Sequence, residues 1–187
     1  MAILPVRIYG DPVLKKRAAE VTVFGESLRR LIADLRDTMG AYHGVGLAAT
    51  QVGVLERVAV VDVPLDEEGT KRASHALVNP VIEHRASSQT AEEGCLSIPG
   101  IFEDVTRAEQ IRVRYQDEQG HGVTLDADGY LSRAIQHEVD HLDGVLFVER
   151  LSALKRQFLR RALDALARGE LPEGYAPPLT HGQGGAS

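Results

Sequence analysis

Two histidines four residues apart, with a glutamate directly after the first, form the strongest chemical pattern in the sequence. They are His137, Glu138 and His141, in the segment QHEVDH. Residues four apart on a helix lie on the same face, so both imidazoles can direct a nitrogen at a metal ion roughly 2.0–2.1 Å away. The pattern predicts a metal site with a base beside it. A surface helix that happens to carry two histidines also fits, so the interpretation depends on a third ligand.

The third ligand is expected upstream of the histidines. A catalytic ion usually keeps three protein ligands and one open position. The third histidine of an HExxHxxGxxH pattern is missing, because Phe147 stands at its position, and carboxylates downstream are few. The segment EEGCLSIPG contains Cys95, the only cysteine of the chain, which excludes an intrachain disulfide. Its thiol is therefore either buried filler or a metal ligand.

Three segments together resemble the signature segments of the peptide deformylases: GVGLAATQ at 44–51, EGCLS at 93–97 and QHEVDH at 136–141. Their order and spacing are those of the family, and the resemblance extends over roughly residues 5–165. It implies a metal-dependent hydrolase that removes the N-formyl group from the N-terminal methionine of newly synthesised polypeptides and releases formate.

The resemblance also implies roles for residues within these segments. The implied metal ligands are Cys95, His137 and His141. The implied catalytic groups are the Glu138 carboxylate, the Gln51 side chain and the backbone N–H of Leu96. The family implies Fe²⁺ as the ion, with Zn²⁺, Ni²⁺ or Co²⁺ as substitutes. The softness of a thiolate ligand suits Fe²⁺ and Zn²⁺ alike.

This donor set has the chemistry that amide hydrolysis requires. A divalent ion beside a thiolate and two neutral imidazoles can lower the pKa of bound water toward about 7. Glu138 is placed to take the proton and to deliver it to the leaving amine. The Gln51 amide and the Leu96 N–H can stabilise the oxyanion that develops on the formyl group.

The substrate is expected to lie along the loop HGVGLAATQVG, whose small residues let main chain approach a bound peptide and pair with it as an added strand. A plain tight turn is the alternative for this loop. Positions that match a pocket for an unbranched apolar side chain such as methionine are Val45, Ala91, Tyr130 and Ala134. Gly46 and Gly94 complete the expected substrate-binding set. Each of the side chains fits ordinary core packing equally well.

The apolar periodicity predicts helices at 27–42, from 128 or 129 to 141, and at 152–168. The expected strands are 57–63, 77–85, 110–117 and 123–127. These elements indicate an α+β fold in which antiparallel sheets pack around the histidine helix, with an N-terminal helix and a C-terminal amphipathic helix. We expect a single catalytic domain over residues 1–170 and a disordered tail over 171–187.

The last helix has two faces with different expected partners. Its apolar stripe, expected to dock on the body, is Leu151, Leu154, Phe158, Ala162 and Ala165. Its basic residues are Lys155, Arg156, Arg160 and Arg161. The net charge of −6 argues against broad nucleic-acid binding, including DNA. These four residues therefore predict only a local contact with the ribosome, where formylated nascent peptides arise. No apolar run is long enough to span a membrane, and a cytoplasmic location is expected.

Three questions stay open at this level. A general HExxH peptidase is a second hypothesis, and it would need a third histidine or carboxylate ligand. A non-catalytic, metal-stabilised module attached to the ribosome is a third, although such a site needs neither Gln51 nor Glu138. The resemblance also implies a basic partner for Glu93, and Arg107 and Arg112 are both candidates.

Overall fold

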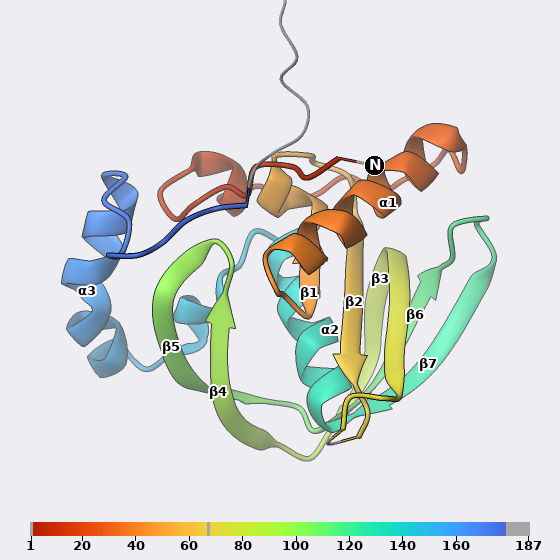
Figure 1. The fold of residues 1–187 in the computed structure, drawn as a ribbon. Helices are drawn as coiled ribbons and strands as arrows, with labels where there is room; N and C mark the ends of the chain where they lie inside the picture. The colour runs from red at the N-terminus through yellow and green to blue at the C-terminus, as the bar shows by residue number, and fades with distance from the viewer. Residues whose placement is uncertain (1, 67, 179–187) are drawn as a thin grey trace, which may run out of the picture.

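The computed structural model describes residues 2–66 and 68–178. Within them the strands form a five-stranded sheet of order β1-β2-β3-β6-β7 and a separate two-stranded sheet, β4-β5 (Figure 1). All strand pairs are antiparallel. The strands are β1 (Gly46–Ala48), β2 (Val58–Pro64), β3 (Arg72–Ala86), β4 (Gln89–Cys95), β5 (Ile98–Arg107), β6 (Gln110–Gln116) and β7 (Gly122–Asp128). The helices are α1 (Glu26–Ala41), α2 (Gly129–Leu142), α3 (Ala153–Ala167) and the short 3₁₀ turns η1 (Pro12–Lys15), η2 (Ala49–Val52) and η3 (Phe147–Arg150). The expected α+β fold is confirmed.

Helices α1 and α2 pack on opposite faces of the five-stranded sheet. The alternation of side chains along β2 explains this arrangement. Val58 and Val60 join the core cluster that contains the apolar residues of α1. Val61 and Val63 point the other way, into the cluster that contains Ile135 and Val139 of α2. Because β2 is covered on both faces, its sequence is almost continuously apolar rather than alternating.

The histidine helix α2 begins directly after β7, and the chain just beyond its end packs closely against the backbone at Lys15. Gly129 at its start has φ +50°, and Gly144 just beyond its end has φ +74°. A Cβ on Gly144 would lie 2.5 Å from the carbonyl oxygen of Lys15, so only glycine fits there. The central position predicted for this helix is confirmed, because it contacts strands β1, β2, β3, β6 and β7.

The β4-β5 hairpin stands beside α2 and carries Cys95 at the end of β4 (Figure 1). The sequence of β4, QTAEEGC, has no apolar alternation, and the sequence left open whether the Cys95 segment is a strand or a loop. Its pairing with β5 runs from Gln89 opposite Arg107 to Gly94 opposite Phe102. A Cβ on Gly94 would lie 2.5 Å from Cε1 of the Phe102 ring, so the glycine makes room for the cross-strand aromatic side chain.

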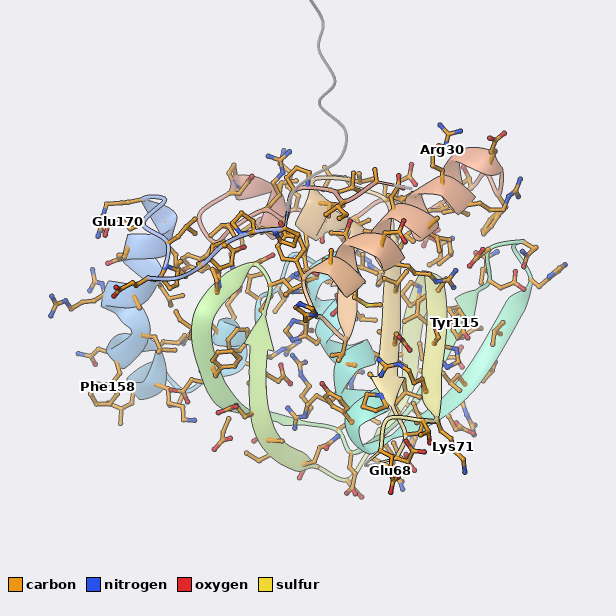
Figure 2. All side chains as sticks on the ribbon, viewed as in Figure 1. Arg30, Glu68, Lys71, Tyr115, Phe158 and Glu170 are labelled. Atoms are coloured by element: carbon orange, nitrogen blue, oxygen red, sulfur yellow. The ribbon has the colours of Figure 1, made fainter. Side chains whose placement is uncertain are left out.

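Helix α3 docks through a different face from the one expected. Ser152 is its N-cap, as the sequence indicates, and accepts a hydrogen bond from Lys155 N–H at 3.2 Å. Leu163 and Leu166 are buried, whereas Phe158 is 78% exposed and lies on the outer side of the helix (Figure 2). Of the expected docking stripe, Leu151 just before the helix is buried in the core, but the stripe is wrong at Leu154 and Phe158, which are exposed. Two apolar rows run along this helix, and the spacing alone does not show which of them meets the core.

Past α3 the chain turns back across the β4-β5 hairpin (Figure 1). Pro172, Tyr175 and Pro178 are half-buried, so this stretch packs on the body although the sequence predicted disorder from residue 171 onward. For residues 179–187 the prediction lies outside the described residues. No helix within residues 2–66 and 68–178 is both long and apolar enough to cross a bilayer.

Candidate active site

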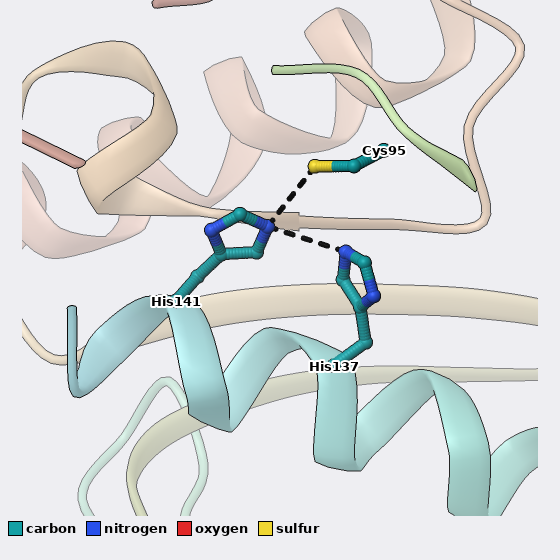
Figure 3. Close-up of side chains that lie close together, drawn as sticks. All are labelled: Cys95, His137 and His141. Carbon is teal, nitrogen blue, oxygen red and sulfur yellow. Dashed lines mark hydrogen bonds between the residues drawn. The ribbon is translucent and has the colours of Figure 1, made fainter. Parts of the chain in front are cut away.

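Cys95, His137 and His141 converge at one point between the hairpin and α2 (Figure 3). The two histidines lie one turn apart on α2, and their Nε2 atoms are 3.2 Å from each other. The sulfur of Cys95 lies 3.2 Å from His141 Nε2. One nitrogen from each histidine and the sulfur all lie within 4.8 Å of one another. The structure thus brings together the three predicted ligands, although the cysteine precedes the first of the two histidines by more than forty residues.

A buried carboxylate fixes the orientation of His137. Glu93 Oε2 lies 3.0 Å from His137 Nδ1, which leaves Nε2 of that ring free to face the point of convergence. The same carboxylate accepts hydrogen bonds from Arg107 Nε at 2.5 Å and from Arg133 Nη1 at 2.6 Å. Burial opposes the ionisation of Glu93, but the hydrogen bonds from His137 and Arg107 outweigh it and lower its pKa to about 2.

The network continues away from the histidines. Arg107 also donates to Asp140 Oδ2 at 2.8 Å, and Asp140 accepts from Arg150 at 2.5 Å. Of the two candidate partners for Glu93, Arg107 is therefore the one that pairs with it. Arg112 instead pairs with Asp126 on the exposed surface at 2.7 Å.

Glu138 lies directly beside the converging donors and is 4% exposed. Burial raises its pKa to about 7, against the opposite influence of His137 and Arg107. Its Oε2 has no hydrogen-bond partner among the described residues. A Cβ on Gly46 would come within 2.3 Å of its Oε1. Gly46 was expected to give a bound peptide room, and it also gives the Glu138 carboxylate room.

Gln51 is held so that its amide NH₂ faces the hairpin turn. Its Oε1 accepts from the Ala48 N–H at 2.9 Å, while Nε2 lies 3.2 Å from Ser97 Oγ and 3.6 Å from Cys95 Sγ. The η2 turn, which directly follows β1, supplies this geometry. Leu96 follows Cys95 in the turn between β4 and β5 and packs against the α1 core cluster. The predicted amide and backbone donors therefore come from two different segments.

A cavity of about 670 Å³ opens beside these groups. Five of the predicted substrate-binding residues line it: Val45, Gly46, Gly94, Tyr130 and Ala134. The cavity is also lined by the groups with predicted roles: Gln51, Cys95, Leu96, His137 and Glu138. His141 does not line the cavity and is buried behind these residues. Ala91 does not line it and is exposed, because in β4 its side chain falls on the outer side; its assignment to the pocket is wrong.

Several lining residues were not singled out from the sequence. Those that line the cavity are Tyr42, Phe102, Arg133 and Tyr175. Another is the buried Ser97, whose hydroxyl accepts a hydrogen bond from the Gln51 side chain. The serine stands inside the EGCLS segment, so its position was a usable signal. The contribution of Tyr175 depends on the path of the chain after α3, for which the sequence contains no periodic signal.

The donor set fits a divalent metal ion. Two Nε2 atoms and a sulfur that face one another from short range can all be satisfied by a cation between them. The electrostatics favour positive charge here: burial disfavours protonation of His137, yet Cys95 and Glu93 raise its pKa to about 10. Burial and the neighbouring His137 hold the pKa of His141 well below its usual value, which keeps that ring neutral. A metal ion that binds here must displace the proton from His137, because a histidine ligand is neutral.

Comparison with known proteins decides the family. A family model described as polypeptide deformylase matches residues 3–157. The chain belongs to the polypeptide deformylase family. The peptide deformylase of Alkalilimnicola ehrlichii is 49% identical over 168 residues, covering 90% of this chain and 93% of that one.

Solved peptide deformylase structures show the same fold. That of Thermus thermophilus has 44% identity and a TM-score of 0.80, covering 89% of this chain and 98% of its own. That of Ehrlichia chaffeensis in complex with actinonin has 37% identity and a TM-score of 0.82, covering 91% and 99%. Peptide deformylases are metal-dependent hydrolases that remove the N-formyl group from nascent polypeptides, and membership of the family assigns this activity to the chain.

Proposed function

We propose that Cys95, His137 and His141 hold one divalent metal ion at which the formyl group is hydrolysed, with Fe²⁺ as the ion and Zn²⁺, Ni²⁺ or Co²⁺ as substitutes. The observation that carries this proposal is the convergence of the three donor atoms within 4.8 Å. One thiolate among the ligands supports Fe²⁺ or Zn²⁺ over harder ions such as Mg²⁺. When bound, such an ion acts as a Lewis acid and lowers the pKa of water toward about 7.

Glu138 is the proposed general base and acid. It takes a proton from the attacking water and later delivers that proton to the amine of the leaving methionine. A pKa near 7 supports both tasks, because the carboxylate is then neither too weak a base nor too weak an acid at neutral pH. Glu138 is 4% exposed, so bulk water has little access to its carboxylate.

Gln51 and Leu96 are the proposed donors to the formyl oxygen. When water adds to the formyl carbon, negative charge develops on that oxygen and hydrogen-bond donors stabilise it. The Gln51 amide is already oriented by Ala48 and Ser97, so no reorganisation is needed during the reaction. The methionine side chain is proposed to fill the part of the cavity lined by Val45, Gly46, Gly94, Tyr130 and Ala134.

Formate release from an N-formyl-methionyl peptide tests this assignment when metal content is measured on the same samples. Glu138→Ala removes the base but none of the three proposed ligands, so it should keep the ion and lose roughly 10²–10⁴-fold in turnover. If the variant keeps both its ion and more than a third of the parent turnover, Glu138 does not have the proposed role.

We further propose a local ribosome contact through α3 in the cytoplasm, where formylated nascent chains emerge. Two features support it: the basic residues on α3, and two exposed apolar side chains, Leu154 and Phe158. Figure 2 shows Phe158 on the outer side of the helix. Lys155 pairs with Glu103 at 2.7 Å and Arg160 lies 3.8 Å from Asp164, so Arg156 and Arg161 supply most of the available charge. Co-sedimentation with ribosomes should weaken when Lys155, Arg156, Arg160 and Arg161 are replaced by glutamine, and unchanged co-sedimentation contradicts the proposal.

A further inference from the structure

The segment after α3 packs against the β4-β5 hairpin at Pro172 and then forms a turn of its own. Pro172 lies against Gly100 of β5, where an added Cβ would come within 2.9 Å of Pro172 Cγ. Gly100 has φ +78°, a conformation that favours glycine, so this close approach uses a residue suited to it. Three residues later the Tyr175 N–H donates to the Pro172 carbonyl at 3.0 Å and forms a turn. The turn places residues 175–178 at the cavity.

The composition of the segment suits a fixed wall. Three of the eight residues from 171 to 178 are prolines, at positions 172, 177 and 178. Proline locks φ, so the chain loses less conformational entropy when such a segment is held in place. Ala176 precedes a proline, which favours an extended backbone at that position. Few contacts are therefore needed to hold the segment against the body.

The cavity continues from the catalytic groups to this segment. Glu138 and Cys95 line it together with Tyr175, Ala176 and Pro178. Tyr175 is half-buried and lines the cavity together with Tyr42. The volume of about 670 Å³ is typical of pockets that enclose a whole small ligand. The methionine and its formyl group occupy only one part of such a space.

We propose that Tyr175, Ala176 and Pro178 form one wall of the peptide groove and that Tyr175 is a specificity-determining residue for the substrate positions after the methionine. The inference rests on the proposed function of the same site. An aromatic ring flanked by prolines offers an apolar surface, so it favours leucine-like side chains at the second and third substrate positions.

The test compares kcat/KM on two substrates: N-formyl-methionine amide, and a formyl-methionyl tetrapeptide with leucine at positions two and three. Tyr175→Ala should lower the ratio of tetrapeptide to amide kcat/KM by about tenfold, mainly through KM, because an apolar contact that only the longer substrate makes is lost. A chain that ends at residue 170 should show at least the same fall. Glu173→Ala, an exposed side chain that does not line the cavity, is the matched control and should leave the ratio unchanged.

An unchanged ratio in Tyr175→Ala overturns the inference. An equal loss on both substrates also overturns it, because the change then acts on the reacting groups rather than on the added contact. A gain on both substrates would make the segment an obstruction instead of a wall, which is the third contrary result. The unmodified protein distinguishes a failure of this inference from a failure of the proposed function. If the metal-loaded parent does not deformylate even the amide, the proposed function itself is contradicted.

Discussion

The Glu93 carboxylate accepts hydrogen bonds from Arg107, Arg133 and His137 while it remains almost fully buried. A buried charge of this kind is stable only when it is paired and hydrogen-bonded. Its position is two residues before Cys95, so the same strand supplies a proposed metal ligand and the group that orients another. The sequence showed this glutamate, but its two arginine partners lie fourteen and forty residues further along the chain.

The depressed pKa of Glu93 predicts a specific loss of stability in acid. Its pKa falls from 4.5 in a free glutamate to about 2 in the folded protein. A lowered folded pKa gives stability that is present above pH 4.5 and is lost as the pH falls toward 2. Glu93→Gln should therefore unfold more easily than the parent at pH 7, by about 3 kcal/mol, with the difference shrinking between pH 4.5 and 2. Denaturant unfolding of both metal-free proteins measures it, and a pH-independent difference contradicts it.

Gly46 is a second single residue on which the site depends. A Cβ there would lie 2.3 Å from Glu138 Oε1, so Gly46→Ala must displace the carboxylate. A displacement of about 1 Å costs on the order of 10²-fold in rate, and we expect that loss in kcat with the metal content preserved. Gly40→Ala in α1 is the control, because no atom lies within 4 Å of the added Cβ. Comparable activity in the two variants would show that the close contact does not matter.

At the scale of elements, the helices and the strands covered by them were predictable from the sequence, whereas the hairpin was not. The apolar runs of β2 and α2 are determined by burial, and burial leaves a periodic signal. Strand β4 is stabilised by cross-strand pairs such as Gly94 with Phe102 and by ion pairs of Glu93, none of which is local in sequence. The three signature segments identified the proposed ligands, but only the fold shows that Arg107, and not Arg112, pairs with Glu93.

The docking face of α3 gives the prediction at this scale. Leu163 is buried against the core that includes Phe147, whereas Phe158 is exposed. Leu163→Ala should lower the free energy of unfolding by about 2–4 kcal/mol, because it leaves a cavity. Phe158→Ala should change it by no more than about 0.5 kcal/mol. Thermal or denaturant unfolding of the two variants measures the difference. A larger loss of stability in Phe158→Ala than in Leu163→Ala would show that the helix docks through the face predicted from the sequence.

For the whole molecule, the fold joins three separate pieces of chain at one point. The η2 turn brings Gln51, the hairpin brings Cys95, and α2 brings the two histidines and Glu138. The five-stranded sheet fixes the first and last of these, because β1 and α2 both pack against β2. An ion held by Cys95 and both histidines would link the hairpin to this body and stabilise the folded state by its binding free energy.

The most direct test of the account measures ferrous ion per chain and formate release on the same anaerobically prepared samples of the parent and Cys95→Ala. The account predicts one ion per parent chain with turnover of a formyl-methionyl peptide. In Cys95→Ala both the bound ion and the turnover should fall together, because one of the three donors within 4.8 Å is gone. Turnover by a metal-free parent, or a variant that keeps both its ion and its activity, would contradict the central claim.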